Sequence, residues 1–288
     1  MKELLNSLSI AKSSYYYGIS LYDKEDKDLL IKGKITTIFN ENKKRYGYRR
    51  ITLELRNQGI IVNHKKVKKL MIILGLFGIK PKVKYHSYKG DMNSTVPNLL
   101  LDKVIDEEKH KTKYKQNFEA TKPNEKWTTD ISEFHIRTGK IYLSPILDMY
   151  DGSIVSYNIS TTPNFEQIKN MLYKAFEVNP NLDGLIFHSD QGWQYQMEPY
   201  HKLLKDKGII QSMSRKGNCM DNGIMESFFG KLKNEMFHGH EYEFDTIDEL
   251  IKSIDEYINY YNNKRIKVKN KGLPPILYRQ QSLNRLSL

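Results

Sequence analysis

Cysteine is almost absent from this sequence, with Cys219 as the single example among 288 residues. One thiol cannot form an internal disulfide, and it excludes the paired-cysteine zinc modules of many small DNA-binding proteins. Long apolar runs are also missing, since residues 70–79 contain two glycines and fall far short of the roughly 20 residues that cross a bilayer. The first 18 residues contain neither the apolar core nor the cleavage site of a secretory signal. We therefore expect a protein of the cytoplasm.

Acidic residues are the minority charge. The 34 Asp and Glu face 46 Lys and Arg, which gives a formal charge of +12. The surplus lies in the N-terminal part, because residues 1–126 contain 27 basic and 14 acidic residues whereas residues 127–288 contain 19 and 20. The length suggests about two domains. This distribution indicates a polyanionic partner, nucleic acid first, although solvated faces of different domains would also explain it.

The basic N-terminal part has a helical pattern. Helices are expected over residues 26–43, over residues 49–57, and from the N-cap Asn63 to Gly75 or Gly78. A lysine-rich last helix after a turn resembles a helix-turn-helix module, whose second motif helix enters the major groove. The alternative is an ordinary helical subdomain with a basic surface. The expected DNA contacts are Arg49, Arg50, Lys65, Lys66, Lys68 and Lys69.

The second half of the chain predicts a mixed α/β domain. Three strands joined by tight turns are followed by alternating helices and strands in the order βββαβαβα. This order predicts a mixed sheet flanked by helices, with the first and fourth strands as neighbours. A final helix over residues 246–263 cannot continue through Pro274 and Pro275. The expected strands are 125–136, 141–150, 153–160, 182–190 and 209–214, and the expected helices are 165–178, 199–207 and one that begins near Asn222.

Three acids are placed where chemistry is usual in such a sheet. Asp130 lies in the first strand, Asp190 ends the fourth, and Glu226 lies in the first turns of the following helix, with 35 residues between Asp190 and Glu226. Clustered carboxylates stay ionised together only with cations, and oxygen ligands select Mg²⁺ or Mn²⁺. Two such ions can support in-line displacement at phosphorus, so the reaction class is phosphoryl transfer. Taken singly, each acid could instead be a strand-edge, turn or helix N-terminal charge.

Other side chains near these acids suit DNA. Trp193 and Tyr195 follow Asp190 and could stack on an unpaired base, with core packing as the alternative. Asp221 is expected to cap the helix that carries Glu226. Basic residues beside an acidic site suit a DNA backbone track, although solvated charges explain them equally well. These basic residues are Arg215, Lys216, Lys231 and Lys233, and Arg265 of the tail could bind phosphate or simply end a helix.

The combined motifs resemble one family, the DDE transposases of bacterial insertion sequences, and within it the second-reading-frame product of the two-frame group. The stretches that carry the resemblance are EKWTTDISEF, HSDQGWQY, MSRKGNCMDNGIMESFFGKLKNE and YNNKR, together with YGYRRITLEL and VNHKKVKKLM. Two departures stand out. Lys267 occupies a place where the family often has histidine, and Gly-Leu-Pro-Pro at 272–275 replaces the more usual threonine-proline.

The resemblance implies a ribonuclease-H-like core in which Asp130, Asp190 and Glu226 hold two Mg²⁺, with Mn²⁺ able to substitute. It implies cleavage that frees a 3′-hydroxyl, followed by strand transfer. The implied DNA partners are the terminal inverted repeats of the element and target DNA. The resemblance also implies an oligomer on DNA, a nucleoid location when bound, and an upstream-frame fusion or partner protein. A structure-selective nuclease and a catalytically silent DNA-binding descendant are the alternatives. The implied organisation is a lead segment at 1–25, a helix-turn-helix-like domain at 26–80, a linker at 81–123, a catalytic core at 124–240, and a C-terminal helix with a basic tail at 241–288.

Overall fold

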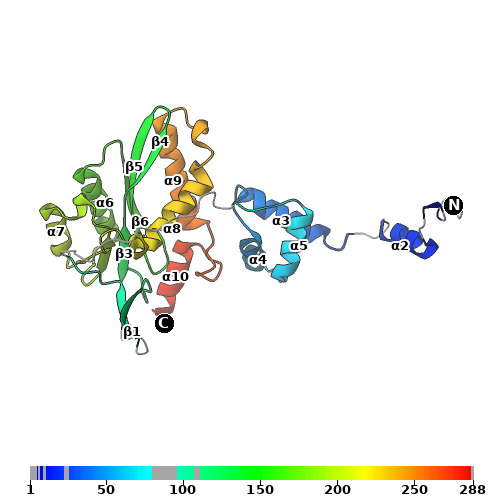
Figure 1. Ribbon diagram of the computed structural model, residues 1–288, viewed down its shortest axis with the longest axis horizontal. Helices are drawn as coiled ribbons and strands as arrows, with labels where there is room; N and C mark the ends of the chain where they lie inside the picture. Colours follow the sequence, from blue (N-terminus) through cyan, green and yellow to red (C-terminus); the bar gives the residue numbers. More distant parts are fainter. Residues whose placement is uncertain are drawn as a thin grey trace. The chain divides into compact units, whose positions relative to one another are not determined.

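The computed structural model describes residues 5, 7–8, 11–22, 26–79, 96–106 and 111–286 (Figure 1). The chain forms two compact units, Met1–Phe77 and Gly78–Leu288. Among the described residues, every helix is too short or too polar to serve as a transmembrane span.

The N-terminal unit contains the three predicted helices, α3 (Leu29–Glu41), α4 (Tyr48–Asn57) and α5 (His64–Ile73). Helix α5 starts where the sequence indicated, because the Asn63 side chain accepts a hydrogen bond from the Lys65 amide at 2.8 Å. The turn between α4 and α5 contains Gly59 at a φ of +79°, a backbone conformation that favours glycine. One apolar face of each helix forms a shared core of Ile35, Ile38, Phe39, Ile51, Leu55, Val67, Leu70 and Met71.

The C-terminal unit is built on a six-stranded mixed sheet. Its strands are β3 (Lys126–Thr129), β4 (Ser132–Ile136), β5 (Gly139–Asp148), β6 (Ile154–Ser160), β7 (Ile186–Ser189) and β8 (Ile210–Met213). The predicted first strand is interrupted at Asp130 and Ile131, and its two pieces, β3 and β4, both pair antiparallel with β5. Strand β6 pairs with the other edge of β5, while β7 pairs parallel with β3 and β8 parallel with β7. The predicted strand order and the neighbouring first and fourth strands are confirmed.

Helices cover both faces of this sheet (Figure 1). Helices α6 (Phe165–Val178) and α7 (Glu198–Lys205) pack on one face through a core that includes Trp127, Met171, Phe187 and Leu204. Helices α8 (Gly223–Leu232) and α9 (Ile247–Asn263) pack on the other through a core that includes Phe134, Phe228 and Ile254. Thr246 and Glu249 form the capping box that starts α9. The expected fold class, a mixed α/β core of ribonuclease-H-like strand order beside a helical N-terminal domain, is what the structure has.

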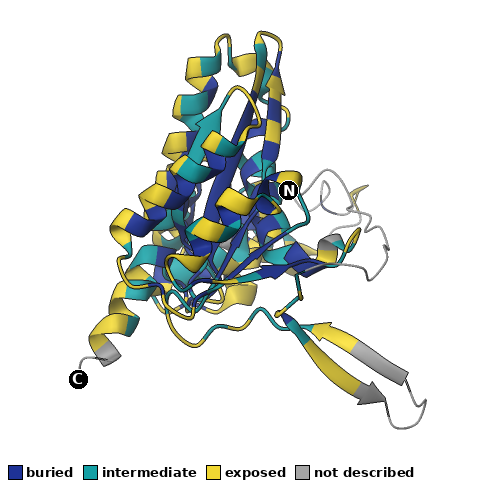
Figure 2. Ribbon diagram, turned by 90° about the vertical axis from the view of Figure 1, so that its left-hand side faces the viewer, coloured by how far each residue is buried: buried dark blue, intermediate teal, exposed yellow. Residues whose placement is uncertain are grey.

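Three elements differ from the sequence prediction. Helix α2 (Lys12–Tyr22) lies in the supposed lead segment, and the antiparallel hairpin β1 (Leu101–Asp106) and β2 (Lys111–Gln116) lies in the supposed linker. The hairpin was missed because residues 101–116 do not alternate apolar with polar residues and contain no glycine or proline turn signal. Figure 2 shows its exposed strands standing away from the buried sheet. Helix α10 (Pro275–Leu286) follows the two prolines, because proline is well tolerated at the first position of a helix.

Parts of the predicted segments lie outside the described residues. Residues 81–95 and 107–110 of the supposed linker belong to this group, as do residues 1–4, 6, 9–10 and 23–25 of the supposed lead segment.

Candidate active site

Asp130 and Asp190 occupy equivalent positions on two neighbouring parallel strands. Thr128 of β3 is in register with His188 of β7, so each aspartate lies two residues beyond a paired position. The interruption after β3 leaves the Ile131 amide to donate to Asp130 Oδ1 at 2.7 Å, and the Gly192 amide donates to Asp190 Oδ1 at 2.9 Å. The carboxyl ends of β3 and β7 therefore place both side chains at one edge of the sheet, as the strand order predicted.

Glu226, in the first turn of α8, belongs to the same electrostatic neighbourhood. Burial raises the pKa of Asp130 to about 7, and the charges of Asp190 and Glu226 add to this rise. Burial also raises the pKa of Asp190. Like charges near a poorly solvated carboxyl favour its protonated form, because protonation relieves the repulsion.

This donor set fits a hard divalent cation. All three side chains offer carboxylate oxygen, the ligand type that Mg²⁺ and Mn²⁺ prefer, and a cation would offset the repulsion that raises the Asp130 pKa. Within the part of the chain that the structure describes, no three His, Cys, Asp or Glu side chains are already arranged as a metal site.

Lys233, one of the basic residues expected beside the Glu226 helix, lies in a different environment from Lys231. Its charge lowers the pKa of Asp130, and its ammonium lies 5.0 Å from the ring centre of Phe134. A π-helical segment, Lys233–Phe237, follows α8 and begins at this lysine. Lys231, by contrast, donates to Ser227 of its own helix at 2.6 Å. The available sequence signal was the seven-residue spacing from Glu226, which returns a side chain to the same helix face.

The aromatic residues after Asp190 divide into one exposed and one buried ring. Trp193 is 56% exposed, whereas Tyr195 is fully buried and lies against Tyr200 with a centroid distance of 5.5 Å. The turn that holds Trp193 is pinned by hydrogen bonds from Gln191 to the Ser214 carbonyl and from Gln196 to the Gln191 carbonyl. Stacking on a base therefore stays a prediction for Trp193, and core packing is the role of Tyr195.

The expected DNA contacts of the N-terminal unit lie mostly at its surface. Arg49, Lys65, Lys66, Lys68 and Lys69 are exposed, and Arg50 is half-buried. Tyr48, the first residue of α4, joins them, because the charged groups of Arg49 and Lys68 lie 5.7 Å and 5.8 Å from its ring centre. Lys66 also forms an ion pair with Asp28 at 2.5 Å.

Two of the expected DNA contacts in the C-terminal unit form ion pairs within the protein. Arg265 is buried, and its guanidinium makes a two-pronged ion pair with Glu235. Arg215 forms a similar pair with the buried Asp221. Because Arg265 is only 1% exposed, a phosphate does not reach its guanidinium in this structure, and a DNA contact there stays a prediction. Lys216 is exposed and Lys231 is half-buried.

The YNNKR stretch is a scaffold for the core. The Tyr261 ring packs against Phe228 of α8 at 5.0 Å between centroids. The Asn262 amide both donates to the Ile154 carbonyl and accepts from the Ile154 amide, each at 2.9 Å. The stretch therefore fastens α9 to α8 and to the edge strand β6. Lys267 has a similar task, since its buried ammonium donates to the Gly152 carbonyl at 2.7 Å.

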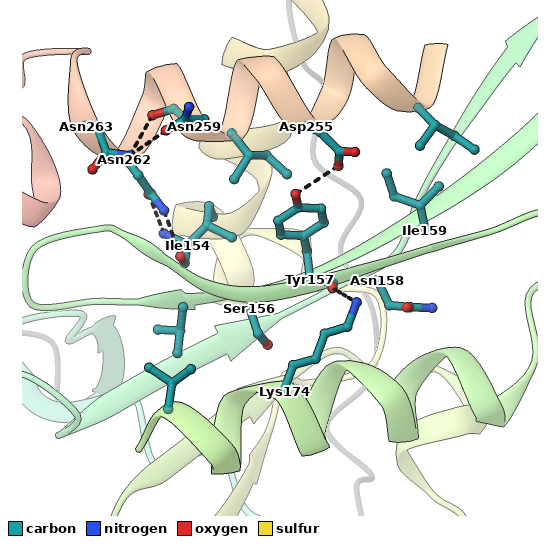
Figure 3. A pocket seen from close by; sticks show the side chains of 14 residues that line it. Ile154, Ser156, Tyr157, Asn158, Ile159, Lys174, Asp255, Asn259, Asn262 and Asn263 are labelled. Carbon is teal, nitrogen blue, oxygen red and sulfur yellow. Dashed lines mark hydrogen bonds between the residues drawn. The ribbon is translucent and has the colours of Figure 1, made fainter. Parts of the chain in front are cut away.

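A cavity of about 640 Å³ lies elsewhere, between β6, α6 and α9 (Figure 3). None of the three acids lines it. Asn262 forms hydrogen bonds with the backbone of Ile154 at this edge. Lys174 donates to the Tyr157 carbonyl at 3.3 Å, and the Tyr157 hydroxyl donates to Asp255. These contacts protect the free edge of the sheet, and we do not assign this cavity to the chemistry.

Family models match most of this chain. The integrase core domain family model matches residues 120–219, and a second integrase core domain model matches residues 226–283. An HTH-like domain model matches residues 25–84.

Several relatives are similar over nearly the whole chain. InsK, named as a transposase for insertion sequence element IS150 of Escherichia coli K12, is 44% identical over 283 residues, which are 98% of this chain and 94% of that protein. A transposase-like protein of Haemophilus influenzae is 49% identical over 81% of this chain and 100% of its own length. Among solved structures, the HTLV-2 integrase catalytic core in complex with magnesium aligns with 56% of this chain and 99% of its own at 15% identity and a TM-score of 0.46.

Proposed function

Because the chain belongs to the insertion-sequence transposases with an integrase core domain, we propose that it is a DDE-type polynucleotidyl transferase that cleaves element ends and joins the freed 3′-hydroxyl to target DNA. The observation that carries this proposal is the placement of Asp130 and Asp190 at the ends of paired parallel strands, with Glu226 close enough to raise the pKa of Asp130.

The three carboxylates share one role in the proposed reaction, which is to hold metal ions. Asp130, Asp190 and Glu226 would hold two Mg²⁺ ions, for which Mn²⁺ would substitute. The ions would stabilise the attacking and leaving oxygens of an in-line displacement at phosphorus. For this, the buried Asp130 must give up the proton that its raised pKa favours, and the nearby ammonium of Lys233 assists that ionisation.

DNA binding is divided between the two units in this proposal. The helix-turn-helix would read the terminal inverted repeats through Arg49, Arg50 and the four lysines of α5, and Lys216 would contact the DNA backbone near the carboxylates. We further propose an oligomer on DNA, an upstream-frame fusion or partner protein, and a nucleoid location when DNA is bound.

The proposal is tested by incubating the protein with duplexes that contain the ends of its own element and with Mg²⁺. Cleavage that leaves a 3′-hydroxyl, followed by joining of that end to a second strand, is the expected result. Cleavage without joining would favour the structure-selective nuclease. End binding without metal-dependent turnover would favour a silent DNA-binding descendant.

Substitution of Lys233 is expected to reduce strand transfer more than substitution of the neighbouring Lys231. We expect Lys233→Ala to lower strand transfer at least about tenfold, because loss of the ammonium raises the pKa of Asp130, and a neighbouring opposite charge typically lowers a carboxyl pKa by about 1 or more. Lys231→Ala is the matched control and should stay within about threefold of the wild-type rate, since Lys231 is bonded to Ser227. Initial rates on one labelled substrate measure both, and equal losses in the two variants would contradict this role for Lys233.

Removal of the exposed indole beside Asp190 is expected to weaken DNA binding. Trp193→Ala should raise the Kd for an end with unpaired terminal bases about 5- to 100-fold, because stacking contributes roughly 1–3 kcal/mol per base. Trp193→Phe should retain most of the affinity, and Tyr242→Ala removes an aromatic ring that is more exposed still, as a control. Anisotropy titrations measure these affinities, and unchanged binding of Trp193→Ala would refute the stacking role.

A further inference from the structure

The 3₁₀ turn before α8, Cys219–Asn222, contains two buried polar side chains that the reaction does not use directly. Asn222 is 4% exposed and the side chain of Asp221 is 0% exposed. They stand four and five residues before Glu226 in the sequence. Their partners lie on other elements, so this turn connects the helix of Glu226 to the rest of the core.

Asn222 connects the turn to the strand that ends at Asp130. Its Nδ2 donates to the carbonyl of Thr129 at 3.1 Å, and its Oδ1 accepts the hydroxyl of the buried Thr128. Thr129 is the residue immediately before Asp130. The asparagine therefore holds the last peptide of β3 directly against the start of α8.

Because the Asn222 side chain bonds to β3, it does not cap α8. Asn222 is the N-cap of α8, and asparagine there usually accepts a hydrogen bond from an amide of the first turn. Its side chain makes no such bond in this structure. A favoured helix cap is replaced by a link to β3.

Asp221 holds the same turn from the other side. Its carboxylate accepts hydrogen bonds from the Arg215 guanidinium at 2.8 Å twice, from Asn98 at 3.0 Å and from Gln116 at 3.1 Å. Asn98 precedes β1 and Gln116 ends β2, so the base of the hairpin is bonded to this turn. The expected capping role of Asp221 is wrong for that reason: the carboxylate faces the hairpin and the loop after β8.

We propose that Asn222 is a positioning residue that sets the separation of Glu226 from Asp130, and thereby the affinity of the carboxylates for a divalent ion. Asp221 braces the turn so that this link stays in one geometry. The inference rests on the proposed function, because it concerns the same three carboxylates. Residues outside the ligand shell that orient metal ligands typically change metal affinity 10- to 100-fold when they are removed.

The test measures Mn²⁺ binding by isothermal titration calorimetry without DNA, beside the Mg²⁺ dependence of strand transfer. Asn222→Ala is expected to weaken Mn²⁺ binding about tenfold and to raise the Mg²⁺ concentration for half-maximal activity by a similar factor, while activity at saturating Mg²⁺ recovers to within a few-fold. Asn234→Ala is the matched control, because the Asn234 side chain donates to a carbonyl one turn earlier, that of Gly230, and its loss should leave both values unchanged.

A second pair of variants shows whether weaker Mn²⁺ binding comes from the lost hydrogen bond or from misfolding. Thr128→Val removes the hydroxyl that bonds to Asn222 and should weaken Mn²⁺ binding in the same direction, whereas Thr128→Ser keeps a hydroxyl and should restore it. Losses of activity and thermal stability without any change in Mn²⁺ affinity would overturn the inference. Asp130→Asn distinguishes failure of this inference from failure of the proposed function. If Asp130→Asn also binds Mn²⁺ like the wild type, the proposed metal site itself has failed.

Discussion

Glu226→Gln should abolish strand transfer, by at least about 10³-fold, and leave the protein folded. The substitution keeps the size of the side chain and removes the charge that, with Asp190, raises the pKa of Asp130. Loss of one of three carboxylates leaves too little negative charge to hold two divalent ions, and metal stabilisation of the reacting oxygens is lost with them. Strand-transfer rates and thermal unfolding without metal measure the two effects.

Glu226→Gln is also not expected to lower the thermal stability of the metal-free protein. Without metal, removal of one of the mutually repelling charges should leave the Tm unchanged or raise it. Glu235→Gln is unsuitable as a control because Glu235 pairs with the buried Arg265, so exposed Glu133→Gln serves instead. Wild-type strand transfer by Glu226→Gln would remove Glu226 from the site.

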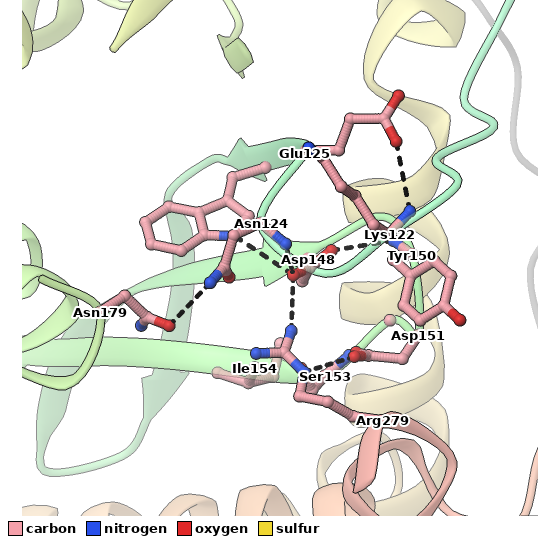
Figure 4. Close-up of polar contacts among 12 residues, drawn as sticks. Lys122, Asn124, Glu125, Asp148, Tyr150, Asp151, Ser153, Ile154, Asn179 and Arg279 are labelled. Carbon is pink, nitrogen blue, oxygen red and sulfur yellow. Dashed lines mark hydrogen bonds and ion pairs between the residues drawn. The ribbon is translucent and has the colours of Figure 1, made fainter. Parts of the chain in front are cut away.

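Arg279→Ala is expected to cause the largest loss of stability, about 3–5 kcal/mol of unfolding free energy. Arg279 of α10 bridges Asp148 and Asp151, whose side chains are both fully buried at the turn between β5 and β6 (Figure 4). Its removal leaves two buried carboxylates beside each other without their shared ion-pair partner. Burial already raises the pKa of Asp148, and Arg279 is the main opposing influence.

Chemical denaturation at neutral pH measures this effect, with the exposed Arg137→Ala as the matched control. We expect Arg137→Ala to change the unfolding free energy by less than about 0.5 kcal/mol. A loss below about 1 kcal/mol for Arg279→Ala would show that the amide donors around Asp148, from Asn124 and Tyr150, are sufficient to hold the charge.

The core of the fold was predictable because its signals are local. The period of the apolar residues located α6 at its observed bounds, and Asn63 and the Thr246 region marked the starts of α5 and α9. The hairpin β1–β2 has no such signal, because its stability comes from backbone pairing and from the bonds of Asn98 and Gln116 to Asp221. That carboxylate is more than 100 residues away from either partner in the sequence.

The candidate site was predictable to the level of its carboxylates. Strand order places Asp130 beside Asp190, and this follows from the order of elements alone. The destinations of the basic side chains did not follow, because Arg215 and Arg265 look like phosphate ligands in the sequence but pair with Asp221 and Glu235 in the structure. Only three-dimensional packing distinguishes an arginine of the core from one that faces DNA.

The most direct measurement of the central claim uses a branched oligonucleotide that mimics a half-finished integration product. The purified chain is incubated with it and Mn²⁺, and the strands are resolved on a denaturing gel beside Asp190→Asn. This substrate demands little recognition of element ends, so it tests the carboxylate core itself. The account predicts a rejoined strand that requires metal and is absent from Asp190→Asn, and a folded wild-type protein that yields no rejoined strand would contradict it.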